Sequence, residues 1–103
     1  MSDHVEHAEP VERARLTVRV SGTVQGVGFR YFVRRVVSRL SVTGWVRNDA
    51  DGTVALVAEG SVEELNELLE AVSQGPSAGE VEDVEVTWSS TFGTFEGFKV
   101  KLW

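Results

Sequence analysis

The sequence predicts an α+β domain in which two helices cover one face of an antiparallel sheet. The first observation is the order of its hydrophobic periods, which is strand, helix, strand, strand, helix, strand and a short last strand. The second is its size and composition, 103 residues with 42% hydrophobic and 25% charged, which suit one globular domain. Together they predict a ferredoxin-like βαββαβ two-layer sandwich with a short additional C-terminal strand.

The first half of the chain carries the clearest change of period. Residues 16–21 alternate between apolar and polar side chains, which indicates a half-buried strand. Three glycines in residues 22–28 indicate a loop with unusual backbone angles. From Phe29 to Leu40 the apolar residues recur with helical spacing, so we expect an amphipathic helix there.

The second half predicts a hairpin, a helix and two more strands. The strands are expected at 42–48, 53–59, 84–89 and 98–103, with a turn at 49–52. Ser61 and Glu64 form a capping-box pattern at the start of the second helix, and Gly75 with Pro76 ends it.

Residues 1–13 are expected to form a flexible acidic tail before a single domain at 14–103. The tail holds both histidines, His4 and His7, and has neither the basic start nor the apolar run of a signal peptide. The sequence has no cysteine, which excludes disulfides, a thiolate nucleophile and metal sites built on sulfur. We therefore expect a cytoplasmic protein, without a membrane segment, and a monomer.

The charge balance restricts what the protein binds. The chain has 16 acidic and 10 basic residues and a net charge of −6, which disfavours nonspecific binding to nucleic acid or to an anionic membrane. An anion must therefore be held by local positive charge. Eight of the ten basic residues are arginines, whose guanidinium groups make two-pronged contacts with oxyanions.

Candidate functional residues gather at one rim of the predicted sheet. The strands at 16–21 and 42–48 are joined through a helix, so they run in the same direction and end at the same edge. The segment GTVQGVGFR at 22–30 follows the first of them, and Asn48 ends the second. Glycine-rich backbone leading into a helix N-terminus, with Arg30 in the first turn, suits an oxyanion such as phosphate. The structural alternative is a tight strand-to-helix connection with a solvated Arg30.

The residue types at this rim exclude several mechanisms. No Lys-Ser/Thr pair completes a P-loop, and Tyr31 replaces the third glycine of a dinucleotide fingerprint. Outside the tail there is no histidine to activate a serine, and Asp49 and Asp51 are more simply turn residues than metal ligands. A site without acid, base, metal or cofactor is still able to cleave a phosphate from a carboxylate, because that leaving group departs unprotonated.

Three segments of the chain resemble the acylphosphatase family: GTVQGVGFR at 22–30, GWVRN at 44–48 and DGTVALVAEG at 51–60. The similarity extends from Leu16 to the FKV run at 98–100. The resemblance implies the same βαββαβ fold and hydrolysis of small acyl phosphates to a carboxylate and inorganic phosphate, with no metal and no cofactor.

The resemblance also implies roles for individual residues. Arg30 falls on the family's phosphate-binding arginine, and Asn48 on the asparagine that positions water. Backbone amides along the loop are expected to wrap the phosphate, with glycines allowing close approach. The predicted phosphate-binding residues are Gln25, Gly26, Val27, Gly28, Phe29 and Arg30.

Other functions remain as alternatives. The same fold can serve as a noncatalytic module that senses phosphate or acyl phosphate or that interacts with other proteins. It can also form a piece of a carbamoyl-phosphate-handling system. An RNA-binding module is disfavoured, because its aromatic residues belong on a strand and those of residues 29–32 fall in a loop and helix. We interpret Arg34, Arg35, Arg39 and Arg47 as a solvated face, with steering of anionic substrates as the alternative.

Overall fold

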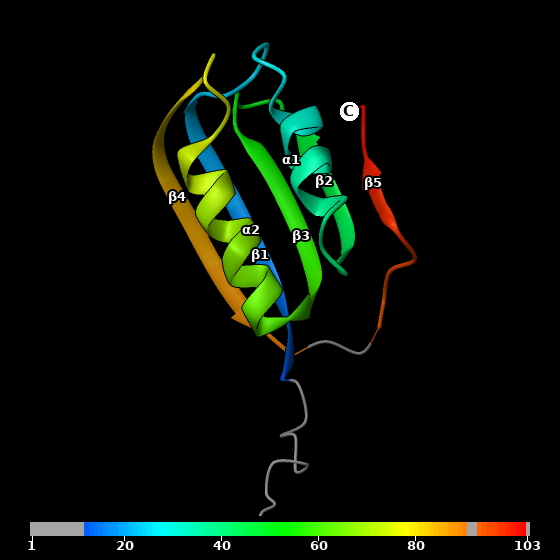
Figure 1. Cartoon of the computed structure of the whole chain (residues 1–103). Coiled ribbons are helices and arrows are strands. Elements are labelled where there is room, and N and C mark those ends of the chain that lie inside the picture. Colours follow the sequence, from blue (N-terminus) through cyan, green and yellow to red (C-terminus); the bar gives the residue numbers. More distant parts are fainter. Residues whose placement is uncertain (1–11, 91–92, 103) are drawn as a thin grey trace, which may run out of the picture.

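The computed structural model describes residues 12–90 and 93–102. Its elements follow the predicted order, and both helices lie on one face of the sheet (Figure 1). The elements are β1 (Arg13–Thr23), α1 (Phe29–Val37), β2 (Thr43–Asn48), β3 (Val54–Ser61), α2 (Val62–Gln74), β4 (Glu80–Ser89) and β5 (Phe98–Val100).

The five strands form one sheet in the order β4-β1-β3-β2-β5. The first four pair antiparallel, which confirms the predicted two-layer sandwich. β5 pairs parallel with β2, so the complete sheet is mixed, a detail that strand periodicity does not contain. Because β5 occupies the edge next to β2, Lys101 and Leu102 after it run toward the rim where the predicted site lies (Figure 1).

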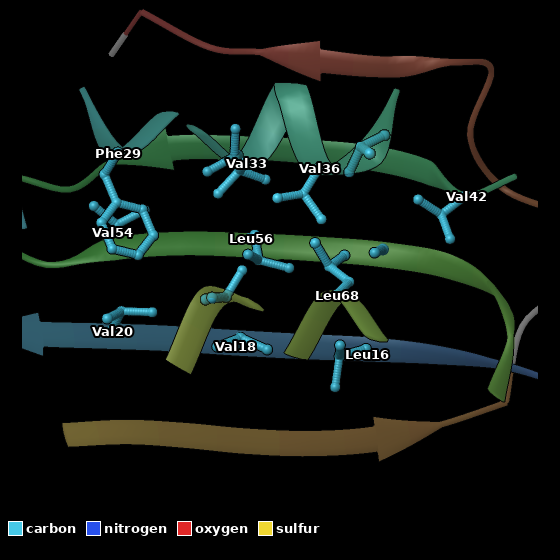
Figure 2. Close-up of a cluster of buried hydrophobic side chains, with 14 of the residues drawn as sticks. Leu16, Val18, Val20, Phe29, Val33, Val36, Val42, Val54, Leu56 and Leu68 are labelled. Atoms are coloured by element: carbon cyan, nitrogen blue, oxygen red, sulfur yellow. The ribbon is translucent and has the colours of Figure 1, made fainter. Parts of the chain in front are cut away.

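The hydrophobic core lies between the sheet and the helices. β1 alternates buried and exposed positions as its sequence predicts, and β3 is buried along nearly its whole length because it is a central strand. Figure 2 shows side chains of β1 and β3 meeting those of both helices. The fully buried members include Leu16, Val18, Val20, Val33, Val46, Val54, Leu65, Leu68 and Val72.

The element ends differ slightly from the predictions. α1 ends at Val37 instead of Leu40, because the amides of Arg39 and Leu40 bond to carbonyls three residues earlier. Leu40 still packs against the core, which is why it shares the helical spacing. β1 begins at Arg13, one residue before the predicted domain boundary. The rest of the predicted tail, with His4 and His7, lies outside the described residues, apart from Glu12.

A buried carboxylate ties the segment before β5 to the helix-free face of the sheet. Glu59 on β3 is 1% exposed, and Arg15 on β1 pairs with it at 2.7 Å. Its second oxygen accepts the backbone N–H of Thr94 at 2.9 Å. A buried charge requires such partners, so this cluster fixes where the chain turns toward β5.

Among the described residues, neither helix combines the length and the apolar character needed to cross a membrane.

Gly44 on β2 offers a test of the close packing of the sheet. Its φ is +145°, and an added Cβ would overlap the carbonyl oxygen of Val57 on the neighbouring strand. We expect Gly44→Ala to lower the free energy of unfolding by about 3 kcal/mol or more, from steric overlap and backbone strain together. Urea denaturation followed by circular dichroism measures this loss.

Gly52→Ala is the matched control. Gly52 also has positive φ, at +92°, but nothing lies within 4 Å of its added Cβ. We expect only the backbone cost there, about 1 kcal/mol. Equal losses for the two variants would contradict the packing argument.

Candidate active site

The rim predicted from the sequence contains a cavity. The loop after β1, the first turn of α1 and the end of β2 enclose a space of about 180 Å³. It is lined by Val24, Gly26, Gly28, Phe29, Arg30, Tyr31 and Asn48. Two segments separated in sequence by a whole helix therefore meet around one small polar cavity.

The loop owes its shape to two glycines. Gly26 and Gly28 have φ of +76° and +77°, in the left-handed region that side chains with a Cβ rarely adopt. Nothing lies within 4 Å of where a Cβ would stand on either residue. The backbone conformation, not lack of space, thus requires glycine here, and it leaves the loop backbone accessible from the cavity.

The N-terminus of α1 is left without a cap. Gly28 occupies the N-cap position, no side chain caps the helix, and its first turn has no acidic residue. α2 shows the usual alternative: the Ser61 hydroxyl accepts the N–H of Glu64 at 3.1 Å, and Glu63 and Glu64 lie in the first turn. Free N–H groups and the positive end of the helix dipole therefore remain available at α1, beside the cavity.

Arg30 adds a full positive charge to the same place. Its Nη1 donates a hydrogen bond of 2.8 Å to the main-chain carbonyl of Lys101, just beyond β5. The guanidinium is half-buried and lines the cavity. A carbonyl acceptor orients the group without neutralising it, so the other N–H groups keep their charge for an anion.

Asn48 faces the cavity from the end of β2. Its backbone pairs with Val54 on β3, which fixes Asn48 as the last residue of β2 before the turn. No group within residues 12–90 or 93–102 forms a hydrogen bond with the side-chain amide of Asn48. It is therefore available for a water molecule or a substrate.

Gln25 joins the loop to the hairpin that carries Asn48. Its Nε2 donates to the carbonyls of Asp49 at 2.7 Å and Thr53 at 2.9 Å. The two halves of the cavity are thus clamped together by one side chain. Asp49 and Asp51 belong to the turn, as predicted, and Asp49 also accepts from Arg47 at 2.7 Å.

Asp51 stabilises the turn from its solvent-exposed side. Hydrogen bonds from the hydroxyl and the backbone N–H of Thr53, at 2.6 and 3.0 Å, lower the pKa of its carboxyl below the usual range. Asp51 is therefore ionised at neutral pH. Because its pKa is lower in the folded chain, its contribution to the turn is lost only as the pH falls below about 4.

The structure brings together most of the predicted site residues. Gly26, Gly28, Phe29, Arg30 and Asn48 line the cavity. Gln25 and Val27 do not: the Gln25 side chain points to the hairpin, and Val27 packs on the core. The wrapping of a phosphate by their backbone amides stays a prediction.

The sequence reasoning missed three contributors to the site. Val24 and Tyr31 also line the cavity, and their positions beside the loop and Arg30 were the available signal. The sequence gives no sign of the contact with the Lys101 carbonyl. Every residue has a main-chain carbonyl, and this one lies 71 residues from Arg30.

A larger groove, of about 540 Å³, lies between β2 and the segment leading to β5. None of the predicted site residues lines it. Trp45, which lines this groove, is half-buried between two cations, with Arg47 and Lys101 at 4.6 and 4.7 Å from its ring. The smaller cavity is the better candidate site, because loop backbone, helix N-terminus, guanidinium and free amide converge there.

No group of three or more His, Cys, Asp or Glu side chains within 12–90 and 93–102 is arranged to hold a metal ion.

Fold and cavity define a class of protein: a small α+β domain in which an uncapped helix N-terminus and an arginine face one small cavity, an arrangement suited to an oxyanion. Comparisons with known proteins specify the family. The family model described as Acylphosphatase matches residues 16–100. The acylphosphatase of Salinibacter ruber is 54% identical over 87 residues, which cover 84% of this chain and 92% of the relative.

Solved structures agree with the family match. The crystal structure of acylphosphatase from Bacillus subtilis superimposes with a TM-score of 0.82 at 38% identity, covering 85% of this chain and 98% of the other. T. kodakarensis HypF is 28% identical with a TM-score of 0.74, but this chain covers only 12% of it. The chain belongs to the acylphosphatase family.

The clamp by Gln25 can be tested separately from the chemistry. Gln25→Ala removes two hydrogen bonds that join the loop to hairpin carbonyls, although each carbonyl keeps a backbone donor within the hairpin. We expect a loss of about 1 to 3 kcal/mol in the free energy of unfolding from the two lost hydrogen bonds. We also expect weaker binding of inorganic phosphate, because loop and hairpin are no longer held together. Urea denaturation and isothermal titration with phosphate measure the two effects.

Gln74→Ala, at the exposed end of α2, is the control and is expected to change neither quantity. Unchanged stability and phosphate affinity in Gln25→Ala would show that Gln25 does not hold the loop and the hairpin together.

Proposed function

We propose that this protein hydrolyses the carboxyl-phosphate bond of small acyl phosphates, using the cavity at the start of α1. The observation that carries the proposal is the convergence of Arg30, the uncapped helix N-terminus and the Asn48 amide on one cavity. The family match over residues 16–100 supports the same reaction.

The phosphoryl group is held by positive charge that is already in place. Arg30 contacts two phosphoryl oxygens, and backbone N–H groups of the loop and of the first turn of α1 contact the others. Because these donors are fixed before substrate arrives, they stabilise the charge spread over the oxygens in the transition state at little reorganisation cost.

Asn48 positions the water. Its amide holds a water molecule opposite the acyl oxygen, so that the water oxygen attacks phosphorus in line. The new P–O bond forms as the bond to the acyl oxygen breaks, and the water proton passes to an oxygen of the phosphoryl group itself. No histidine is required for this step.

The leaving group explains why no general acid is needed. A carboxylate has a conjugate-acid pKa of about 4 to 5 and leaves as an anion at neutral pH. A phenolic phosphate ester has a poorer leaving group, with a pKa nearer 10 for a phenol such as tyrosine. The site is therefore selective for acyl phosphates over phosphate esters.

We propose that the domain at 14–103 carries the activity and that it needs neither metal nor cofactor. We also propose that the protein is a monomer located in the cytoplasm. Absence of cysteine from the sequence is compatible with a reducing compartment. A noncatalytic phosphate sensor with the same fold is the second candidate, and the two differ in one observable: a sensor binds acyl phosphate without consuming it.

The role of Arg30 is tested with benzoyl phosphate in the presence of chelator. We expect Arg30→Ala to lower kcat/KM more than 100-fold, about 3 kcal/mol of transition-state stabilisation, and to weaken inhibition by phosphate. Arg30→Lys keeps the charge but not the two-pronged geometry, so it should recover only part of the activity.

Arg13→Ala, at the opposite end of β1, is the control for loss of an arginine, and p-nitrophenyl phosphate should remain intact with every variant. Near-normal kinetics in Arg30→Ala would contradict the proposed role of Arg30 in binding the phosphoryl group. Wild-type protein that binds acyl phosphate but leaves it intact would favour the sensor.

The role of Asn48 is tested by separating turnover from binding. We expect Asn48→Ala to lower kcat about 100-fold, because the water is no longer aligned, while inhibition by phosphate changes less than about threefold. Steady-state hydrolysis with phosphate as inhibitor measures both, and Asn66→Ala on the exposed side of α2 is the control. A parallel loss of phosphate affinity would instead make Asn48 a binding residue.

A further inference from the structure

The charges of this acidic protein are separated along its sequence. Residues 29–48 contain five arginines and no Asp or Glu. Residues 59–85 contain nine acidic residues and no Lys or Arg. A net charge of −6 therefore conceals one strongly cationic segment.

The two segments form different elements of the fold. The cationic segment forms α1 and β2, whereas the acidic segment forms the end of β3, α2 and part of β4, the edge strand farthest from β2 (Figure 1). They meet where Glu64 of α2 accepts the N–H of Ser41 at 3.0 Å. The outer surface of α1 and of its following turn carries Arg34, Arg35 and Arg39, all exposed. We call these three the arginine face.

The arginine face is not neutralised within the described chain. None of its three side chains forms an ion pair or a hydrogen bond with residues 12–90 or 93–102. Arg15 and Arg19 on β1 and Arg47 on β2 differ in this respect, since all three have carboxylate partners.

The helix dipole explains only part of this pattern. Arg34 and Arg35 lie in the last turn of α1, where positive charge is favourable. The dipole gives no reason for the lack of any carboxylate through residue 48. It also favours acidic residues in the first turn, and α1 has none.

We propose that the arginine face selects acyl phosphates whose acyl half itself carries a negative charge. The proposal rests on the proposed function, because the anion drawn to α1 is the substrate of the cavity at its N-terminus. α1 has nine residues and spans about 14 Å, so the arginine face lies well within the roughly 30 Å screening length of 10 mM salt. Attraction grows with the charge of the approaching anion, so a second anionic group gains more than the phosphate alone.

The test compares acetyl phosphate, which has a neutral acyl half, with succinyl monophosphate, which adds a carboxylate. At 10 mM ionic strength we expect R34Q/R35Q/R39Q to lose about fivefold in kcat/KM on succinyl monophosphate and only about threefold on acetyl phosphate, because the electrostatic energy is proportional to the charge of the substrate. The value of kcat should be unchanged for both. At 0.5 M salt, the loss in kcat/KM caused by the triple variant should be the same, and small, for both substrates.

A second variant separates local charge from net charge. Adding E63Q/E67Q/E70Q on α2 to the triple arginine variant restores the net charge of −6 without restoring the arginine face. We expect the loss on succinyl monophosphate to persist. Circular dichroism melts of both variants verify that they are folded.

Each other outcome overturns the proposal. Equal losses on the two substrates, recovery in the charge-restored variant, or no loss at low salt would each exclude selection by the arginine face. The wild-type rate on acetyl phosphate reports separately on the proposed function: normal hydrolysis without discrimination refutes only the selection, whereas no hydrolysis of either substrate refutes both.

Discussion

The hydrogen bond between Arg30 and the carbonyl of Lys101 is the contact on which the geometry of the site depends. A carboxylate partner would hold the guanidinium at least as firmly, but it would compete directly with phosphate for the same charge. A neutral carbonyl fixes the direction of the side chain and leaves its charge available. The acceptor must therefore be placed by the fold, because a main-chain carbonyl has no side chain with which to reach its partner.

Placement of that carbonyl explains the less regular part of the fold. Lys101 follows β5, and its N–H donates to the carbonyl of Val46 at 2.8 Å, which continues the pairing with β2 toward the rim. The chain reaches this edge after contact with Glu59, whose buried carboxylate accepts the N–H of Thr94. A sandwich of four strands and two helices would be complete without this extension. The fifth strand positions the Arg30 acceptor, and this gives it a function as well as a place in the sheet.

The part of this arrangement that is local in sequence was predictable. Alternation in β1, helical spacing from Phe29 and the capping pattern at Ser61 each report nearby backbone geometry, and the order of elements then places loop and Asn48 at one rim. Contacts between distant segments were not predictable in the same way. The acceptor at Lys101, the parallel direction of β5 and the hairpin contacts of Gln25 depend on tertiary packing, for which periodicity carries no information. The family resemblance predicted that the backbone amide of Gln25 binds phosphate. In the structure, its side chain instead joins the loop to the hairpin.

The two helices also show the physical cost of keeping an anion site empty and ready. A side-chain cap such as Ser61 contributes about 1 kcal/mol, and α1 forgoes it because Gly28 adopts a left-handed conformation in which serine would be strained. That loss is small beside the roughly 5 to 15 kcal/mol of a typical domain. Among residues 12–90 and 93–102, the first N–H groups of α1 are left without a protein partner. Under the proposed function, a bound phosphate would supply the missing acceptors. The substrate would then take the place of the cap, and the helix end would be most stable when the site is occupied.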